Sequence, residues 1–281
     1  LPVALAVEGG QSAEVLATLK LAGRVRGPEL AGVLARHAPG VHRWLDAEGK
    51  LGAFKGAAGW EAALSLPAPA EDGTTTLSRT LRVDSSLEGL AVELPWPFGK
   101  PAAERLPFRL ETAFQPGEPH QTRLQVGEGV QLTVQQTSPA EGSGLEGLDV
   151  ALGPGEPGRK PASGIALHGR ASELPLGDWN ALFAHGGSPV QGLPLAFDLQ
   201  VDTLTALGQR FSGVRLKGSR TGARWEAKVD GEHAAGSLSL DATAAEPRLQ
   251  MDMTRLWLTP LGANGQSPQV DPRALPTLSL R

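Results

Sequence analysis

The sequence predicts a mainly β protein, built from an antiparallel sheet with a few short helices. Apolar and polar residues alternate over many short segments, and turn-like clusters of glycine, proline and acidic residues separate these segments. The 36 glycines and 23 prolines among 281 residues leave little room for long helices. With 40% hydrophobic and 20% charged residues, the chain is apolar enough to fold around a core.

The alternation is clearest over residues 193–201, where leucine, phenylalanine and valine occupy the odd positions. Successive side chains of a strand point to opposite faces, so this segment has one apolar and one polar face. Similar runs predict strands over residues 18–25, 77–83, 90–94, 106–110, 130–134, 225–229, 234–240 and 249–253. Short turns between many of these strands favour an antiparallel meander.

Two segments predict short helices. The first begins near Pro28, repeats apolar residues at helical spacing up to His37 and ends at Pro39, with a second turn expected over residues 41–45. The other begins at Asp178 as N-cap and ends at Gly186. Neither is long enough to be stable alone, so both must pack on the sheet.

Residues 141–162 are rich in glycine and proline and predict a long surface loop. We expect one β-meander unit with a short helical insert over residues 1–140, and a second unit with a short helix over residues 163–281. Short echoes such as residues 60–62 and 225–227 fit two related units, although chance explains them equally well. The chain begins without methionine and ends in an alternating segment, so we expect a segment of a longer β-sheet protein.

Charge and composition argue against several classes of function. The net charge is −4 and no basic run is present, which argues against nucleic acid as a partner. The absence of cysteine excludes disulfides, thiolate metal sites and cysteine nucleophiles. No stretch of 18 or more apolar residues occurs, so we expect no membrane-spanning helix in this sequence.

No local pattern predicts a catalytic, metal or cofactor site. Residues 142–147 match the spacing G-x-G-x-x-G, but a glycine and proline cluster follows where a helix would be needed. The carboxylates of Asp198 and Asp202 suit a solvated strand face, and the six tryptophans follow core positions rather than a sugar-binding platform. The histidines lack metal-ligand spacing and are expected in loops or at the surface: His37, His42, His120, His168, His185 and His233. The sequence therefore predicts a protein that is not an enzyme.

The apolar face of the sheet is the feature that points to a function. If the few short helices cannot cover it, an apolar groove stays open and marks a binding surface. An ordinary protein core is the alternative, because alternation alone does not show what covers the face. The residues predicted to line the groove are Leu195, Phe197, Leu199, Val201, Leu238, Leu240, Leu249, Met251 and Met253.

Several segments resemble the YhdP branch of the AsmA-like family of bacterial envelope proteins. Residues 87–102 read LEGLAVELPWPFGKPA and are similar to that family's strand followed by an L-P-x-P-x-G-K-P-A segment. Residues 207–216 read LGQRFSGVRL and, with Trp225 and residues 234–238, resemble a meander of the family. Residues 271–278 resemble its linker into the next block of strands. The resemblance covers residues 50–281.

The resemblance implies an elongated, curved, taco-like sheet around an apolar groove, as in bridge-like lipid-transfer proteins. It implies a periplasmic segment of a parent protein that is anchored in the inner membrane. Its implied partners are phospholipid acyl chains, adjoining segments of the same longer chain, and both membranes through the parent. The implied function is to carry phospholipids between the inner and outer membranes and so to support the outer-membrane permeability barrier. A glycan-binding or adhesin-like structural protein and a β-rich hydrolase with a carboxylate pair are the alternatives.

Overall fold

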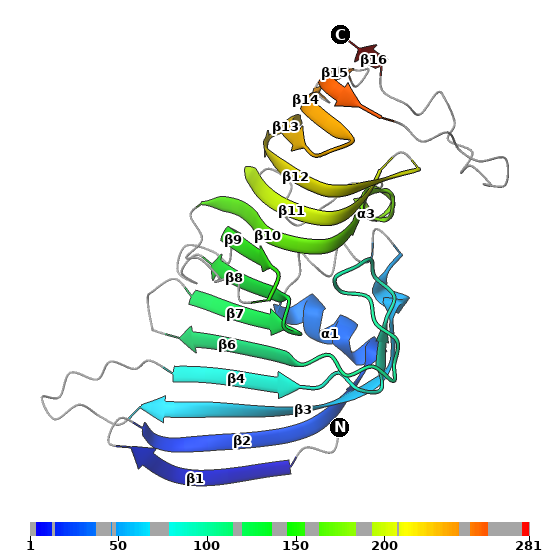
Figure 1. Cartoon of the computed structure of the whole chain (residues 1–281). Helices are drawn as coiled ribbons and strands as arrows, with labels where there is room; N and C mark the ends of the chain where they lie inside the picture. Colours follow the sequence, from blue (N-terminus) through cyan, green and yellow to red (C-terminus); the bar gives the residue numbers. More distant parts are fainter. Residues whose placement is uncertain are drawn as a thin grey trace, which may run out of the picture. The chain divides into compact units, whose positions relative to one another are not determined.

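The computed structural model describes residues 4–12, 15–37, 46, 49–67, 79–114, 120–136, 145–154, 163–183, 193–206, 208–241, 248–257 and 277–280. Most of these residues lie in β-strands, which confirms the predicted mainly β class (Figure 1). The chain divides into two compact units. Unit 1 comprises Leu1–Ser163 and His185–Pro189, and unit 2 comprises Gly164–Ala184 and Val190–Arg281.

Unit 1 contains an antiparallel meander with the strand order β1-β2-β3-β4-β6-β7-β8-β9. The short strand β5 (Leu90–Val92) pairs instead with the beginning of β3. The strands of the meander are β1 (Ala4–Ser12), β2 (Val15–Arg26), β3 (Phe54–Pro67), β4 (Arg79–Ser85), β6 (Phe108–Phe114), β7 (His120–Val126), β8 (Val130–Gln136) and β9 (Leu145–Leu152).

Unit 2 contains a sheet with the strand order β10-β11-β12-β13-β14-β15-β16, and Figure 1 shows that β10, β11 and β12 bend along their length. Its strands are β10 (Gly164–Pro175), β11 (Leu195–Ala206), β12 (Gln209–Thr221), β13 (Arg224–Asp230), β14 (Ala234–Asp241), β15 (Arg248–Leu256) and β16 (Thr277–Leu280). The pairs β10–β11 and β15–β16 are parallel, which corrects the prediction of a wholly antiparallel sheet. Parallel neighbours need a long connection that returns the chain to the same end, and both of these connections are long.

The described helices are α1 (Gly27–His37), the 3-10 turn η1 (Leu51–Ala53) and α3 (Leu176–Phe183). Helix α1 confirms the helix expected near Pro28, whereas the turn expected over residues 41–45 lies outside the described residues. Helix α3 begins two residues before Asp178, so the prediction of Asp178 as N-cap is wrong. The carboxylate of Asp178 lies in the first turn of α3, where it still interacts favourably with the positive end of the helix dipole.

The predicted loop over residues 141–162 is wrong where β9 lies. Leu148, Val150 and Leu152 pair there with apolar residues of β8. The glycine and proline clusters on both sides of this strand concealed its alternation, and cross-strand packing outweighs the local turn preference. The residues from 155 to 162 lie outside the described part of the chain.

A small core lies where α1 meets β3. Buried Ala58, Leu90 and Val92 form it, and Leu30 of α1 and Phe54 are among the partly buried side chains packed against them. Ala58 pairs with Val25 near the end of β2, and α1 contacts both strands. The helix and β5 therefore cover one end of β2 and β3.

Lys100 holds the segment that follows β5 in place. Its side chain is buried, with the residue only 5% exposed. The ammonium donates hydrogen bonds to the backbone oxygens of Leu87 at 2.9 Å, Leu90 at 2.5 Å and Pro101 at 2.9 Å. Burial lowers the pKa of Lys100 below its usual value, and the carboxylates of Glu104 and Glu88 oppose this shift. The three N–H groups of the ammonium thus meet three carbonyl oxygens, and Lys100 links the segment that follows β5 to β5 itself.

We expect Lys100→Ala to lower the free energy of unfolding by about 2–4 kcal/mol, because it leaves buried carbonyl groups without a donor. Lys55→Ala removes an exposed ion pair to Glu93, 2.6 Å long, and should cost less than about 1 kcal/mol. Urea unfolding of both variants measures the difference. Equal stability of the two variants would show that Lys100 has no special role.

Candidate functional site

Strand register divides the sheet of unit 2 into an apolar face and a charged face, because residues paired across neighbouring strands share a face. Three rows of paired residues make up the apolar face, each running from β10 to β15. The first row is Ile165, Leu195, Arg220, Trp225, Leu240 and Leu249, the second is Leu167, Phe197, Gly218, Ala227, Leu238 and Met251, and the third is Gly169, Leu199, Leu216, Val229, Gly236 and Met253.

The structure places all nine predicted groove residues on this one face, eight in the three rows and Val201 just beyond the third. Leu199, Val201 and Met251 are only 2%, 1% and 8% exposed, as residues of an ordinary core are. The other six are partly exposed and leave apolar surface available: Leu195, Phe197, Leu238, Leu240, Leu249 and Met253. That lipid covers this surface stays a prediction.

Phe197 packs directly onto the sheet. A Cβ atom added to Gly218, its partner on β12, would lie 2.5 Å from the Phe197 ring and even closer to the backbone oxygen of Glu226. Glycine at this position therefore leaves the space that the ring fills. Phe197 covers part of the apolar face itself.

The alternation of buried residues changes phase beyond Val201. On β12, Val214 and Phe211 are buried, whereas Ser212 and Gly213 between them are both exposed. Gly213 has a φ of +60°, a conformation that residues with side chains rarely adopt. Phe211 and its partner Leu204 are both buried, although strict alternation from Val201 would put them on the charged face.

Unit 1 has an apolar face of the same kind. Most of its large residues from β4 to β9 are partly exposed, whereas Val130 and Leu152 are buried, and α1 packs on the neighbouring strands β2 and β3. One row runs through Leu21, Ala62, Val83, Leu110, Leu124, Leu132 and Val150. Sequence reasoning did not assign these residues to a groove, although the alternation in residues 77–83, 106–110 and 130–134 was a usable signal.

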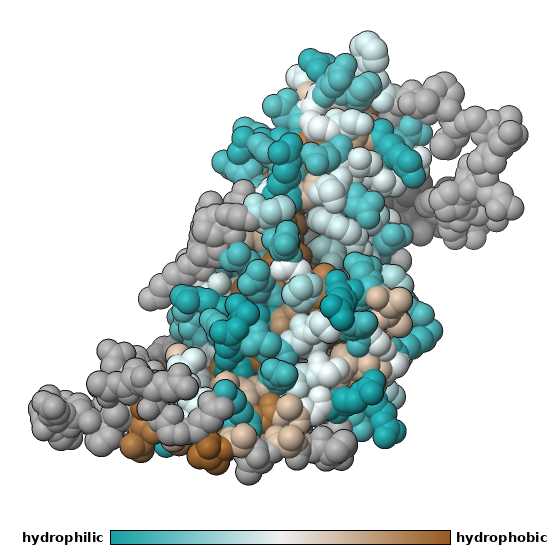
Figure 2. Space-filling view, turned by 60° about the horizontal axis from the view of Figure 1, so that its bottom comes forward, coloured by the Kyte–Doolittle hydropathy of each residue, from teal (hydrophilic) through white to brown (hydrophobic). Residues whose placement is uncertain are grey.

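The apolar face of unit 1 extends to its edge strand β1. Val7 pairs there with Leu19 and is 68% exposed. Figure 2 shows hydrophobic residues at the surface at the bottom of the view, where β1 and β2 lie. Large apolar side chains that stay accessible to solvent over several strands are typical of a binding surface.

The opposite, charged face carries ion pairs that join neighbouring strands. In unit 1, Asp84 of β4 accepts hydrogen bonds from Arg82 Nε at 2.7 Å and from Arg109 Nε of β6 at 2.8 Å. In unit 2, Arg215 Nη2 lies 3.0 Å from Asp198. The hydrogen bond from Arg82, opposed by partial burial and supported by Arg109, lowers the pKa of Asp84. The side chains of these ion pairs are partly exposed to water, whereas Asp149 and His168 on the same faces are buried.

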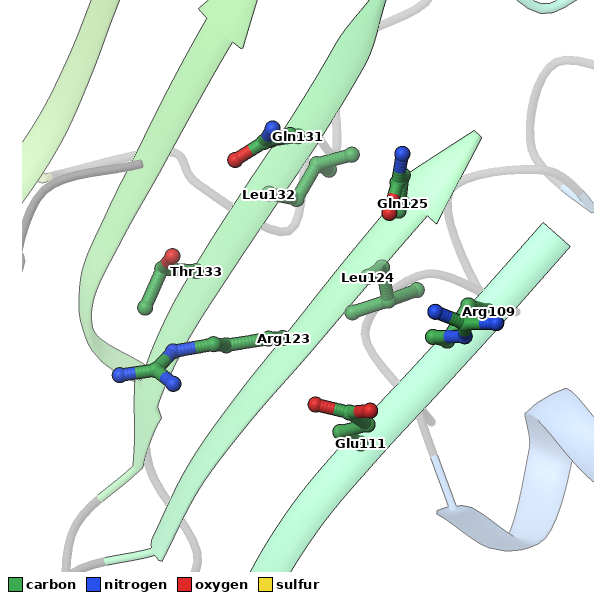
Figure 3. Close-up of a pocket in the computed structure, with 8 residues that line it drawn as sticks. All are labelled: Arg109, Glu111, Arg123, Leu124, Gln125, Gln131, Leu132 and Thr133. Atoms are coloured by element: carbon green, nitrogen blue, oxygen red, sulfur yellow. The ribbon is translucent and has the colours of Figure 1, made fainter. Parts of the chain in front are cut away.

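A hollow of about 350 Å³ lies on the charged face of unit 1 (Figure 3). Figure 3 shows its side chains on β6, β7 and β8. None of the lining residues is aromatic, so the hollow lacks the stacking surface that sugar-binding sites use. The lining consists of Arg109, Glu111, Arg123, Leu124, Gln125, Gln131, Leu132 and Thr133.

Some predicted surroundings of aromatic and titratable residues need correction. His168 was expected at the surface but is 6% exposed, because it lies within β10 opposite Asp198 of β11. Trp257 was expected in the core but is 68% exposed after the end of β15.

Among the residues that the structure describes, no three histidine, aspartate or glutamate side chains gather closely enough to hold a metal ion. The helices in this described part are too short or too polar to cross a membrane.

The open sheets with their apolar faces agree with the resemblance seen in the sequence motifs. The family model described as "YhdP protein" matches residues 2–281. The chain belongs to the YhdP family. The match extends the YhdP resemblance from residues 50–281 to the first strands of unit 1. Comparison with curated proteins and with solved structures found no significant match.

Asp84 predicts a pH dependence of stability. Its folded pKa lies below the ordinary value of 3.8, so its stabilisation is complete above about pH 4 and is lost as the pH falls through the folded pKa. We expect Asp84→Asn to remove this part of the acid sensitivity. At pH 7, Asp84→Asn should lower the free energy of unfolding by less than about 1 kcal/mol, because the ion pairs of Asp84 with Arg82 and Arg109 are partly exposed. Urea unfolding at pH 7 and pH 3 measures it, and an unchanged pH dependence would refute the assignment.

Proposed function

We propose that this YhdP-family chain is a segment of a periplasmic bridge-like protein whose apolar faces carry phospholipid acyl chains between the inner and outer membranes. The supporting observation is the apolar face in each unit, on which large aliphatic side chains of neighbouring strands remain partly exposed. An acyl chain is the complementary partner for such a surface. It is long, apolar and flexible enough to follow the side chains from strand to strand.

The energetics favour a carrier over a tight binding site. Each CH₂ group that leaves water for an apolar surface gains roughly 0.8 kcal/mol. Side chains in one row repeat at the strand spacing of about 4.8 Å, so a tail that advances by one strand exchanges its contacts for similar ones. The net free-energy change of each step is then small. No bond is made or broken, and the proposed process needs no catalytic residue.

The proposal includes a location and partners. The parent protein would be anchored in the inner membrane and would extend through the periplasm. Its partners would be phospholipid acyl chains, adjoining segments of the same chain and, through the parent, both membranes. The charged faces with their interstrand ion pairs suit contact with the aqueous periplasm. Transport along the apolar faces would support the outer-membrane permeability barrier.

A glycan-binding or adhesin-like structural role is the second candidate. Its supporting observation is the polar hollow of Figure 3, whose arginine, glutamine and threonine side chains can hydrogen-bond to sugar hydroxyl groups, although no aromatic ring lines it for stacking. Screening the purified chain against an oligosaccharide panel tests this role. Specific binding that Gln125→Ala abolishes would favour it over lipid transport.

We expect Leu238→Asp to lower the phospholipid that co-purifies with the chain at least about tenfold, because an unpaired carboxylate on an apolar surface costs several kcal/mol. Leu238 is partly exposed and lies between Ala227 and Met251. Ser237→Asp is the matched control, since Ser237 is exposed on the charged face of the same strand. Native mass spectrometry measures the bound lipid.

Circular dichroism checks that both β14 variants fold, and Leu238→Gln replaces Leu238→Asp if the carboxylate prevents folding. Gln200→Asp is a further control on the charged face. Asp198 is less suitable, because it is paired with Arg215. Folded Leu238 variants that retain as much lipid as the wild type would identify Leu238 as ordinary core.

In the full-length parent, we expect Leu238→Asp to weaken the outer-membrane barrier, because one obstructed position interrupts a continuous path. Cells with this variant should become sensitive to detergents and large hydrophobic antibiotics, whereas cells with Ser237→Asp should resist them as the wild type does. Protein levels must be equal in all strains. A normal barrier with Leu238→Asp would argue against transport along this face.

A further inference from the structure

One charged side chain lies within the three rows that form the apolar face of unit 2. It belongs to Arg220, at the end of β12, and the row that contains it is apolar on both sides. Leu195 of β11 is its partner on one side, and Trp225 of β13 is its partner on the other. A charge on an apolar surface is unfavourable unless something compensates it, so this position calls for an explanation.

The contacts of Arg220 keep its guanidinium at the end of the strands. Its Cζ atom lies 5.4 Å from the centroid of the Trp225 ring, and Nη2 donates a hydrogen bond to the backbone oxygen of Leu193 at 3.0 Å. Trp225 is 36% exposed. The turn that joins β12 to β13 follows directly. The stacked pair therefore lies where the apolar rows end.

Further positive charge lies at the same end of the strands. Arg224, Asp241 and Arg248 are paired with one another in register, next to the row of Arg220. Arg224 is bound to Asp241 at 3.1 Å, and Arg248 is exposed. With Arg220, these strand ends carry three arginines and one aspartate. Arg224, Asp241 and Arg248 lie on the charged face, so Arg220 is the charged residue of the three rows on the apolar face at this end.

We propose that Arg220 and Trp225 bind the phosphate group of a phospholipid whose acyl chains lie on the adjoining rows. This inference rests on the proposed function and adds a headgroup site to it. A guanidinium pairs with phosphate oxygens through two parallel hydrogen bonds, and stacking on an indole presets its orientation. Tryptophan suits the boundary between apolar tails and water.

The occupant follows from the combined chemistry of the site. Leu240 and Leu249 continue the row of Arg220, and Phe197 and Leu238 lie one row further inward, all of them partly exposed. An anionic group at Arg220 thus has apolar surface beside it, along the strands and across them. This arrangement fits an amphiphile with a phosphate head better than a free anion or an uncharged lipid.

Native mass spectrometry of the purified chain tests the site with three probes: phosphatidylglycerol, diacylglycerol with the same acyl chains, and inorganic phosphate alone. We expect Arg220→Gln to weaken phosphatidylglycerol binding about tenfold or more and to leave diacylglycerol binding unchanged. Arg220→Lys should restore part of the affinity, because it keeps the charge but not the fork geometry. Arg248→Gln, at the same strand end but on the charged face, should bind like the wild type.

Three results would overturn the inference. An equal loss of both lipids in Arg220→Gln would mean that the residue only supports the shape of the face. Unchanged phosphatidylglycerol binding would place the headgroup elsewhere. Inorganic phosphate that binds alone with the same dependence on Arg220 would indicate a free-anion site. Failure of the proposed function is a separate result, in which the wild-type chain binds neither lipid. If Arg220→Gln fails to fold, Arg220→Lys decides the question by its preference between the two lipids.

Discussion

Backbone pairing between neighbouring strands is the constraint on which the rest of this structure depends. It aligns side chains from many strands into rows, such as the row from Leu21 to Val150 in unit 1. A slip of one residue between two strands would move every apolar side chain of one strand to the charged face. Ion pairs such as Arg109 to Asp84 and Arg215 to Asp198 connect adjacent strands and favour the observed register.

The two faces that result differ in how they are covered. On the charged face water reaches the interstrand ion pairs, although Asp149 of β9 and His168 of β10 are buried there. The apolar face is covered by protein where α1, β5 and the segment held by Lys100 meet the ends of β2 and β3. Elsewhere in the described part of unit 1, most of its large side chains remain partly exposed. A protein that buried this face completely would gain stability but would lose the surface on which the proposed function depends.

Unit 2 combines three environments within a few strands. Leu199 and Val201 form an ordinary core, Leu238 and Leu240 offer accessible apolar surface, and Arg220 with Trp225 adds a charge where that surface ends. The accessible apolar surface and the charge at its end follow the order of acyl chain and phosphate group in a phospholipid. Membership of the YhdP family and the geometry of the face thus support the same proposal from independent observations.

The sequence by itself determined which residues share a face, because the period of two is a local property of a strand. Within each of β11, β14 and β15 the predicted groove residues lie on one face for this reason, and helix α1 was likewise recognisable from local spacing. Only the tertiary structure decided which strands are neighbours. The parallel pair β10–β11, the strand β9 inside a predicted loop, the burial of His168 and the place of Arg220 beside Trp225 all depend on partners distant in the chain. Local patterns contain no information about such pairings, since the free energy that selects them comes from contacts between strands.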